Sequence, residues 1–411
     1  MICKERFRGR DDIDELTVFG TIVLVVAGGL LLALIATKLN ERFPVPEPAL
    51  FLLLAAIASD IFPELSERLS IQQVERIGVV ALIVILFNGG TLVGSRRFRV
   101  AAVPIFSLGV FGTFATAGVI AVAAHYLFDF SWTIAGILGA ALAPTDPAVM
   151  FSVLGQREIR GRAGTILEGE SGVNDPVGIA LMIGMIELAQ DADASFWVVV
   201  EEFSIEMTVG LAIGVVGAAA MRPLLRFSLP NPGLYPLRTL AAAGVIYGTA
   251  STLHGSGFLA VFVAGVALGD ADVPLRHSIE RFHTSLASLA EVVVFAALGL
   301  TIDVTDVLSS TRLLEGLALA VILALIARPL AVGPLLLPVR MRPKERLFVI
   351  WGGLRGAVPI LLAAFALLAD VEDARRVYEI VFVVVAFSVL VQGSSIPWVA
   401  RRLGIPMRSV Q

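Results

Sequence analysis

The sequence predicts an all-α polytopic membrane protein of about thirteen transmembrane helices, arranged as inverted repeats with two broken helices that cross. The first observation is composition: 57% of the 411 residues are hydrophobic and only 16% are charged, against roughly 45–50% and 25% in soluble domains. The second is an alternation of charge between successive loops, and the third is a pair of interrupted apolar spans. The apolar residues form long runs rather than alternating with polar ones, which argues against a β-barrel.

The apolar runs lie between charged or Pro/Gly-rich breaks, and most of them approach the roughly 20 residues of a helical crossing. The run at 257–269 is short, so we expect a re-entrant or distorted span there. No small-residue cleavage site closes the first run, which favours a span over a signal peptide. We expect one integral-membrane domain over residues 1–411 and no soluble regulatory domain. The predicted spans are 17–38, 45–61, 76–94, 100–128, 131–154, 164–188, 204–225, 237–253, 257–269, 284–302, 313–337, 345–369 and 377–399.

The loops alternate between a basic set and an acidic or mixed set. The positive-inside rule places the basic loops in the cytoplasm. The C-terminus is then cytoplasmic, and an odd number of spans puts the N-terminus outside, in an inner or plasma membrane with lipid around the helices. The basic loops carry Lys38 and Arg42; Arg96, Arg97 and Arg99; Arg157, Arg160 and Arg162; Arg222 and Arg226; Arg276 and Arg281; Arg340, Arg342, Lys344 and Arg346; and Arg401, Arg402 and Arg408.

Rare residue types exclude several functional classes. The single cysteine, Cys3, leaves no internal disulfide and no Cys-rich metal site, and the four histidines form no metal-binding spacing. A net charge of −4 gives no support to nucleic-acid binding. We therefore expect no cofactor and no nucleic-acid partner.

The fifth run is interrupted at 144–147 by the sequence PTDP. Each proline removes a backbone donor and clashes with the carbonyl four residues earlier. The carbonyls of Ala140 and Ala143 are therefore expected to be free to coordinate a cation. Two interpretations stay open for Thr145 and Asp146: they only cap a second half-helix, or they cap it and also contribute to an ion site.

The sixth run carries five polar or acidic residues, although a charged side chain in a membrane helix costs roughly 2.5–3.5 kcal/mol. Ser171 and Asp175 are four residues apart and share one helix face, while Glu170 and Asn174 form an adjoining stripe. With Glu168, these residues present two rows of oxygen atoms to one neighbouring region. The pattern favours an ion-binding helix over a purely structural one.

Two arginines lie in late spans and need partners there. We expect Arg328 to pair with a buried carboxylate, with Glu170 as the first choice. Arg355 lies in the glycine-rich segment 352–356, which predicts a second broken helix. Two interrupted spans in corresponding places of the two halves are typical of an inverted-repeat transporter with a site at the membrane midplane. Opposed half-helix dipoles would meet there, and Asp146 and Arg355 would compensate them.

Three further polar residues stay ambiguous. Asn88 ends the third span, where it either adds a ligand or marks a turn with the two glycines that follow it. The sequence does not decide whether Glu291 and Glu315 face a pore or the membrane interface.

The motifs together resemble the monovalent cation/proton antiporters of the bacterial NhaP and animal sodium/proton exchanger family, over nearly the whole chain. The resemblance implies an NhaA/NhaP-like antiporter fold and a homodimer, in which a six-helix ion-translocating bundle lies beside a dimerisation bundle. We assign the core bundle to about 100–188 and 313–399, the dimerisation bundle to about 17–94 and 204–269, and a connecting helix to about 284–302. The motifs are A-P-T-D-P at 143–147, E-S-G-V-N-D-P at 170–176, A-R-P at 327–329 and G-G-L-R-G-A at 352–357.

The resemblance also implies roles for single residues. Asp175 resembles the carboxylate that binds the ion and the proton, and Asn174 precedes it. Ser171 and Thr145 resemble neutral oxygen ligands of the monovalent cation, and Asp146 joins this set of expected ion-binding residues.

Other residues resemble structural parts of the family's site. Glu170 matches a glutamate that pairs with a late-span arginine, here Arg328, while Asp146 and Arg355 match the charged groups at the helix crossing. Asn88 and Glu168 are candidate extra ligands. At the position of Asn88, many members of the family carry an acidic residue.

The expected function is that of a secondary antiporter, not an enzyme, which exchanges protons for Na⁺, or for K⁺ or Li⁺, across the cell membrane. We expect electroneutral 1:1 exchange serving pH and cation homeostasis, with K⁺/H⁺ exchange by the same fold as the alternative. A passive channel would need a ring of identical ligands. An intramembrane aspartyl hydrolase would need Asp146 and Asp175 to share a proton, and it would carry a YD or GxGD motif that this sequence lacks.

Overall fold

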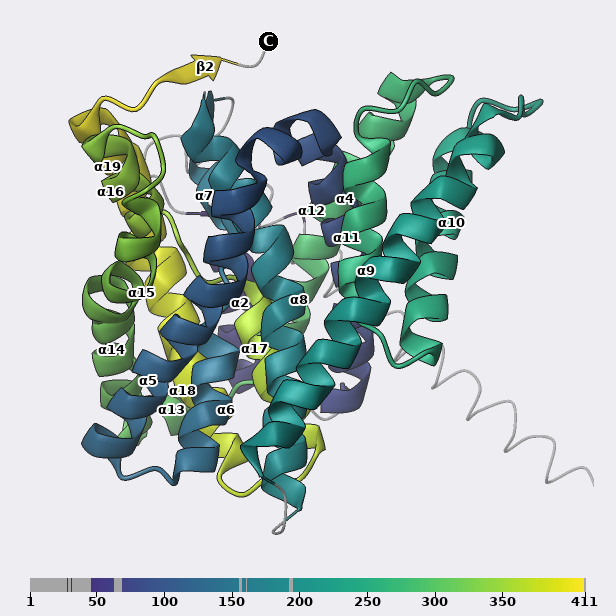
Figure 1. Cartoon of the computed structure of the whole chain (residues 1–411). Helices are drawn as coiled ribbons and strands as arrows, with labels where there is room; N and C mark the ends of the chain where they lie inside the picture. The colour runs from purple at the N-terminus through teal and green to yellow at the C-terminus, as the bar shows by residue number, and fades with distance from the viewer. Residues whose placement is uncertain are drawn as a thin grey trace, which may run out of the picture.

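The computed structural model describes residues 28, 31, 46–62, 69–154, 157–159, 161–191 and 195–409. Cys3 and nearly all of the first predicted span, 17–38, lie outside the described residues. The described chain is a bundle of helices with one very small β-ladder, which confirms the predicted fold class (Figure 1).

The helices follow the predicted spans from the second to the thirteenth. Helices long and apolar enough to cross a membrane cover residues 71–128, 162–190, 196–226, 276–299, 312–336 and 374–403. The first half of the chain forms α2 (Glu47–Ile61), α4 (Ile71–Phe106), α5 (Thr113–Phe128), α6 (Trp132–Leu142), α7 (Pro147–Leu154), α8 (Arg162–Gln190) and α9 (Phe196–Arg226). The second half forms α10 (Leu234–Thr252), α11 (Gly257–Leu268), α12 (Arg276–Gly299), α13 (Val304–Ser309), α14 (Arg312–Ile322), α15 (Arg328–Leu336), α16 (Pro343–Trp351), α17 (Ala357–Leu368), α18 (Ala374–Phe387) and α19 (Ser394–Leu403).

Short π-helical segments join some of these helices into longer spans. Segment η2 (Ser107–Gly112) joins α4 to α5, η3 (Leu323–Ala327) joins α14 to α15, and η4 (Ser388–Gly393) joins α18 to α19. Such π-bulges occur often at functional sites. Here η3 immediately precedes Arg328, and η4 carries Ser388, which contacts the second broken helix.

Helix α4 contains the predicted span 76–94 and the beginning of the span 100–128, separated by a kink at Gly94. Its φ of 66° is a left-handed conformation that glycine adopts at little cost. Beyond the turn, the new helix is capped from a distant loop, because Asp270 accepts hydrogen bonds from the Ser95 hydroxyl at 2.9 Å and the Arg96 N–H at 2.6 Å. The turn therefore replaces a loop between two antiparallel spans.

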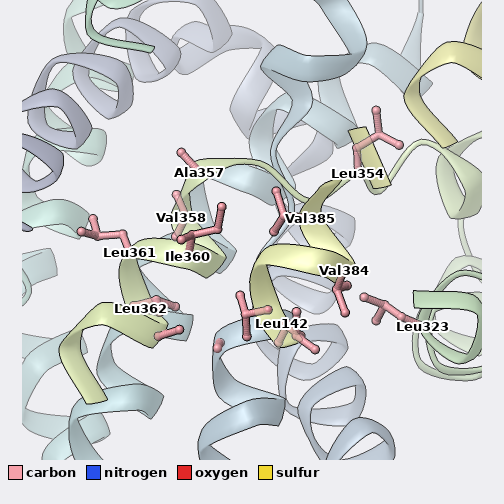
Figure 2. Packing of buried hydrophobic residues seen from close by; sticks show 14 of the residues in the cluster. Leu142, Leu323, Leu354, Ala357, Val358, Ile360, Leu361, Leu362, Val384 and Val385 are labelled. Carbon is pink, nitrogen blue, oxygen red and sulfur yellow. The ribbon is translucent and has the colours of Figure 1, made fainter. Parts of the chain in front are cut away.

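Both predicted interruptions are present, and the two broken helices cross. The first break separates α6 from α7 at residues 143–146, and the second separates α16 from α17 at residues 352–356. The Asp146 N–H donates to the Leu354 carbonyl at 2.8 Å, which ties the breaks together. Apolar side chains surround this polar crossing, among them Leu142 of α6 and Val384 of α18, both fully buried (Figure 2).

The bundle has two sides with α8 and α17 between them (Figure 1). Helices α9 to α11 lie on one side, and α14, α15, α16 and α19 lie on the other. A hydrophobic cluster of its own joins α9, α10 and α11 to Phe87 of α4. The short helix α11 packs tightly on α4, where Gly90 and Gly265 leave no room for Cβ atoms.

Two three-residue strands complete the fold. Strand β1 (Arg157–Ile159) follows α7, and β2 (Met407–Ser409) lies near the end of the chain. They pair antiparallel, with Ile159 opposite Met407. The end of the chain is thereby attached to the loop that leads into α8.

Candidate ion-binding site

The carboxylate of Asp175 is buried in the middle of α8, with only 4% of the residue exposed. Ser171 lies one turn earlier on the same helix face, beside this carboxylate. The Oδ1 atom is buried and has no hydrogen-bond partner among the described residues. A buried oxygen without a partner is costly, so this atom is a natural ligand for a cation or a proton.

Asp175 lines a cavity of about 690 Å³ between α8, α4 and α12. The lining extends from Asp175, in the middle of α8, to Arg97 of the basic loop at 96–99. The polar and charged side chains along it are Glu47, Asn88, Arg97, Asp146, Ser152, Glu168, Ser171, Asp175, Thr284, Ser288 and Glu291. Five carboxylates against one arginine make this part of the described structure attractive to cations.

Thr145 and Asn174 come together, but they satisfy each other. The Asn174 amide donates to the Thr145 hydroxyl at 2.8 Å, and its oxygen accepts the Thr145 N–H at 3.3 Å. Both residues are buried, and neither belongs to the cavity lining. The pair joins the first break to α8 and thereby fixes the position of Asp175 next to Asp146.

Asp146 lies in the cavity wall at the point where two half-helices begin. It immediately precedes α7, and its Oδ2 occupies the place that a Cβ atom would need at Gly356, the residue before α17. The N-terminus of a helix carries a partial positive charge. Two such ends therefore stabilise the Asp146 carboxylate, and only glycine at position 356 permits the close approach.

Arg355 contacts the C-terminal end of α6 at the crossing. Its Nε donates to the Leu142 carbonyl at 2.9 Å, at the C-terminus of α6, and its Nη1 donates to the Gly353 carbonyl at 2.6 Å. Its backbone N–H donates to the Ser388 hydroxyl at 2.9 Å. The guanidinium therefore satisfies the carbonyl end of α6, where the helix dipole is negative.

Glu170 and Arg328 form a two-bond ion pair away from the cavity. Arg328 Nη1 and Nη2 donate to the two carboxylate oxygens at 2.5 and 2.9 Å. The residues are 0% and 2% exposed. The same guanidinium lies against Gly353, so the pair connects α8 and α15 with the second break.

The two candidate extra ligands and one further carboxylate also line the cavity. Asn88 is buried, and its side-chain oxygen accepts a long hydrogen bond of 3.4 Å from Thr284. Glu168 lies one turn before Ser171. The sequence alone does not decide the orientation of Glu291. The helical spacing of Thr284, Ser288 and Glu291 could have indicated that α12 presents this face to the site.

The described structure combines an apolar helical bundle, two crossing broken helices and a buried carboxylate at the inner end of an open cavity. These features define a secondary membrane transporter.

Comparisons with known proteins then identify the family. The family described as sodium/hydrogen exchanger, transmembrane, matches residues 22–402. The K(+)/H(+) antiporter NhaP of Alkalimonas amylolytica is 36% identical over 392 residues, which cover 94% of this chain and 68% of that protein. The Na(+)/H(+) antiporter NhaH of Halobacillus aidingensis is 27% identical over 409 residues, covering 94% of this chain and 98% of that protein.

A solved structure agrees in fold. The sodium proton antiporter MjNhaP1 from Methanocaldococcus jannaschii superposes with a TM-score of 0.77 at 23% identity, covering 92% of this chain and 99% of that one. The chain belongs to the sodium/hydrogen exchanger family. It is a membrane-embedded, multi-pass monovalent cation/proton antiporter, and the predicted resemblance is confirmed.

Proposed function

We propose that Asp175 is the site at which one monovalent cation and one proton bind in turn. The observation that carries the proposal is the unpartnered, buried Oδ1 of Asp175 at the inner end of the cavity. Burial favours the neutral, protonated carboxyl, whereas a bound cation restores a neutral site with the carboxylate ionised. Each state excludes the other, which is the requirement for exchange.

The neighbouring residues divide into ligands and supports. Ser171 supplies a neutral oxygen beside Asp175, and Asp146 adds a second carboxylate in the same wall. Thr145 and Asn174 hold the first break against α8. We therefore assign cation binding to Asp175, Ser171 and Asp146, and positioning to the Thr145–Asn174 pair.

We propose K⁺ and Na⁺ as the transported cations to test first. The antiporters named for K⁺ are the more similar relatives, at 34–36% identity, whereas the relative named for Na⁺ is 27% identical. A site with Asn88 in place of a carboxylate has a weaker electrostatic field, which favours an ion that loses its water at lower cost. K⁺ has the lower dehydration cost of the two.

The proposed orientation has the N-terminus outside and the C-terminus in the cytoplasm. The cavity lining includes Arg97, which belongs to one of the basic loops, and this supports a cytoplasmic opening. The chain would then be in an inward-open state, in the cell membrane, and would serve pH and cation homeostasis.

We also propose a homodimer surrounded by membrane lipid. The separate hydrophobic cluster of α9, α10 and α11, and the many apolar side chains that α9 exposes, support a dimerisation bundle beside the core. Helix α12 contacts α2, α4, α10 and α17, as a connecting helix would.

The decisive experiment uses proteoliposomes that contain a pH-sensitive dye and a proton gradient, challenged in turn with Na⁺, K⁺ and Li⁺. Wild-type protein should dissipate the proton gradient when the transported cation is added. Asp175→Asn should abolish this dissipation of the gradient, although the variant protein still inserts into the membrane and purifies normally. Asp306→Asn, an exposed aspartate of α13, is the matched control and should transport normally. Appreciable exchange by Asp175→Asn would refute the assignment.

A further inference from the structure

Glu291 is another of the carboxylates that line the cavity. It lies on α12, two turns beyond Thr284 and one turn beyond Ser288, and all three residues line the cavity. Its Oε1 is buried and has no hydrogen-bond partner in the described part of the chain. Asp175 and Glu291 therefore face the same space from two different helices.

Three other carboxylates of the membrane helices have protein counterions. The Glu170 carboxylate pairs with Arg328, that of Glu315 with Arg376 and that of Glu379 with Arg312. For Glu291, the described residues provide no arginine or lysine within ion-pair distance. A charged group at this depth is costly unless compensated, and the cavity gives mobile cations access to it.

Glu291 also lies near other carboxylates of the cavity lining. It interacts electrostatically with Glu47, an exposed residue at the start of α2, and with Asp146 at the crossing. Asp146 in turn interacts with Asp175. The charged groups that face this space from the surrounding helices are Glu47, Arg97, Asp146, Glu168, Asp175 and Glu291.

We propose that Glu291 is a staging ligand for the monovalent cation, which binds it in the cavity before the cation reaches Asp175. The proposal rests on the proposed role of Asp175, whose buried and unpartnered oxygen marks the inner end of the path. In this role, Glu291 attracts the cation without taking part in the exchange of cation for proton. Glu291 thus sets the affinity of the transporter for its cation, and Asp175 carries out the exchange.

This role predicts a specific kinetic signature. A group that binds the cation ahead of the exchange step changes the apparent KM and leaves the maximal rate nearly unchanged. Glu291→Gln should raise the apparent KM for the transported cation by roughly three- to tenfold, the effect of losing one charge a short distance from the path. Glu291→Asp, which keeps the charge, should stay within about twofold of wild type by the same reasoning.

The test measures cation-driven proton movement in proteoliposomes over a range of NaCl and, separately, KCl concentrations. Glu280→Gln is the matched control, because Glu280 is an exposed glutamate of the same helix that pairs with Arg276. A double variant, Glu291→Gln with Ser288→Glu, moves the carboxylate one turn within the same cavity face. It should recover most of the lost affinity.

Several outcomes would overturn the proposal. An apparent KM unchanged by Glu291→Gln would show that the carboxylate does not meet the cation, and so would failure of the double variant to recover affinity. Complete loss of exchange in a folded Glu291→Gln protein would place this residue in the exchange step itself. If the Gln variant does not fold, Ser288→Lys supplies the test, since a positive charge beside the path should raise the apparent KM.

Asp175→Asn is measured in parallel. Exchange by that variant refutes the Asp175 assignment. An inactive Asp175→Asn together with an unchanged apparent KM for Glu291→Gln refutes only the staging role.

Discussion

Arg328 holds both carboxylate oxygens of Glu170 in the interior of the bundle, at 2.5 and 2.9 Å, with its guanidinium lying against Gly353. Neither residue lines the cavity in which Asp175 lies. The pair therefore joins α8 to the second broken helix.

Breaking this pair on one side should destabilise the protein more than replacing both partners. Glu170→Gln leaves the Arg328 charge buried without a counterion, which costs about 3–5 kcal/mol. The double variant Glu170→Leu with Arg328→Met removes both charges and should melt at a higher temperature than Glu170→Gln alone. Thermal unfolding in detergent is the measurement. Unchanged melting of Glu170→Gln together with selective loss of cation binding would assign the residue to transport instead.

Protons and cations should compete at Asp175. In the proposed mechanism one carboxylate binds either of them. A higher proton concentration on the cytoplasmic side should therefore raise the apparent KM for the cation and leave unchanged the maximal rate reached at saturating cation. Initial rates over a matrix of pH and cation concentration check this. A falling maximal rate at constant KM would point to a separate inhibitory proton site.

Exchange should be electroneutral. The residue before Asp175 is Asn174, which does not titrate, so a single carboxylate releases one proton for each cation bound. Asp146 should stay ionised through the cycle, because it lies at the positive ends of α7 and α17. The test is exchange in proteoliposomes at clamped membrane potentials of opposite sign, with current recording on a solid-supported membrane. Sustained current would mean that a second group, Asp146 or Glu168, titrates.

Loss of the Thr145 hydroxyl should weaken transport through misplacement rather than through loss of a cation ligand. Thr145→Val leaves the Asn174 amide without its acceptor, and a lost hydrogen bond that leaves a buried group unpaired costs about 1–3 kcal/mol. Thr145→Ser restores that acceptor and should restore rate and melting temperature together. A Thr145→Val protein with normal melting but a shifted preference between Na⁺ and K⁺ would instead make Thr145 a direct ligand.

The cap at Gly94 should contribute stability that depends on pH. Partial burial acts to raise the pKa of Asp270, but hydrogen bonds from the Arg96 N–H and the Ser95 hydroxyl and the charges of Arg96 and Arg276 lower it below its ordinary value. A group with a lowered folded-state pKa stabilises the protein above its unfolded pKa, about 3.9, and loses this effect as the pH falls through the folded value. Asp270→Ala should therefore melt below wild type at neutral pH, and the difference should shrink in acid. A difference in melting temperature that stays constant with pH would mean that the Asp270 charge contributes nothing.

The sequence was sufficient for those features of the site that depend on spacing along one helix or on a local break. Pro144 and Pro147 predicted the first interruption, the glycines around Arg355 predicted the second, and the four-residue spacing of Ser171 and Asp175 placed them on one face. Each follows from backbone geometry alone, so no knowledge of neighbouring helices was needed.

Contacts between helices were predictable only where charge limited the choice. Arg328 could be matched to Glu170 because a buried arginine needs a carboxylate. Thr145 and Asn174 had many alternative partners, since a hydroxyl and an amide can bond to water, backbone or an ion with similar energies. Their mutual hydrogen bonds were therefore not predicted from the sequence.

The sequence by itself determined the membrane class, the order of the spans and the polar residues of α8, because hydrophobic run length and helical period are properties of consecutive residues. Only the tertiary structure decided that Asp175 and Glu291 face one cavity, that Arg355 satisfies the carbonyl end of α6, and that Asp270 caps a helix 175 residues earlier in the chain. The physical reason is that these relationships depend on how the helices pack. The rotation and depth of each helix are set by many small contacts, such as the close approach of Gly90 to Gly265, and no pattern along a single segment records them.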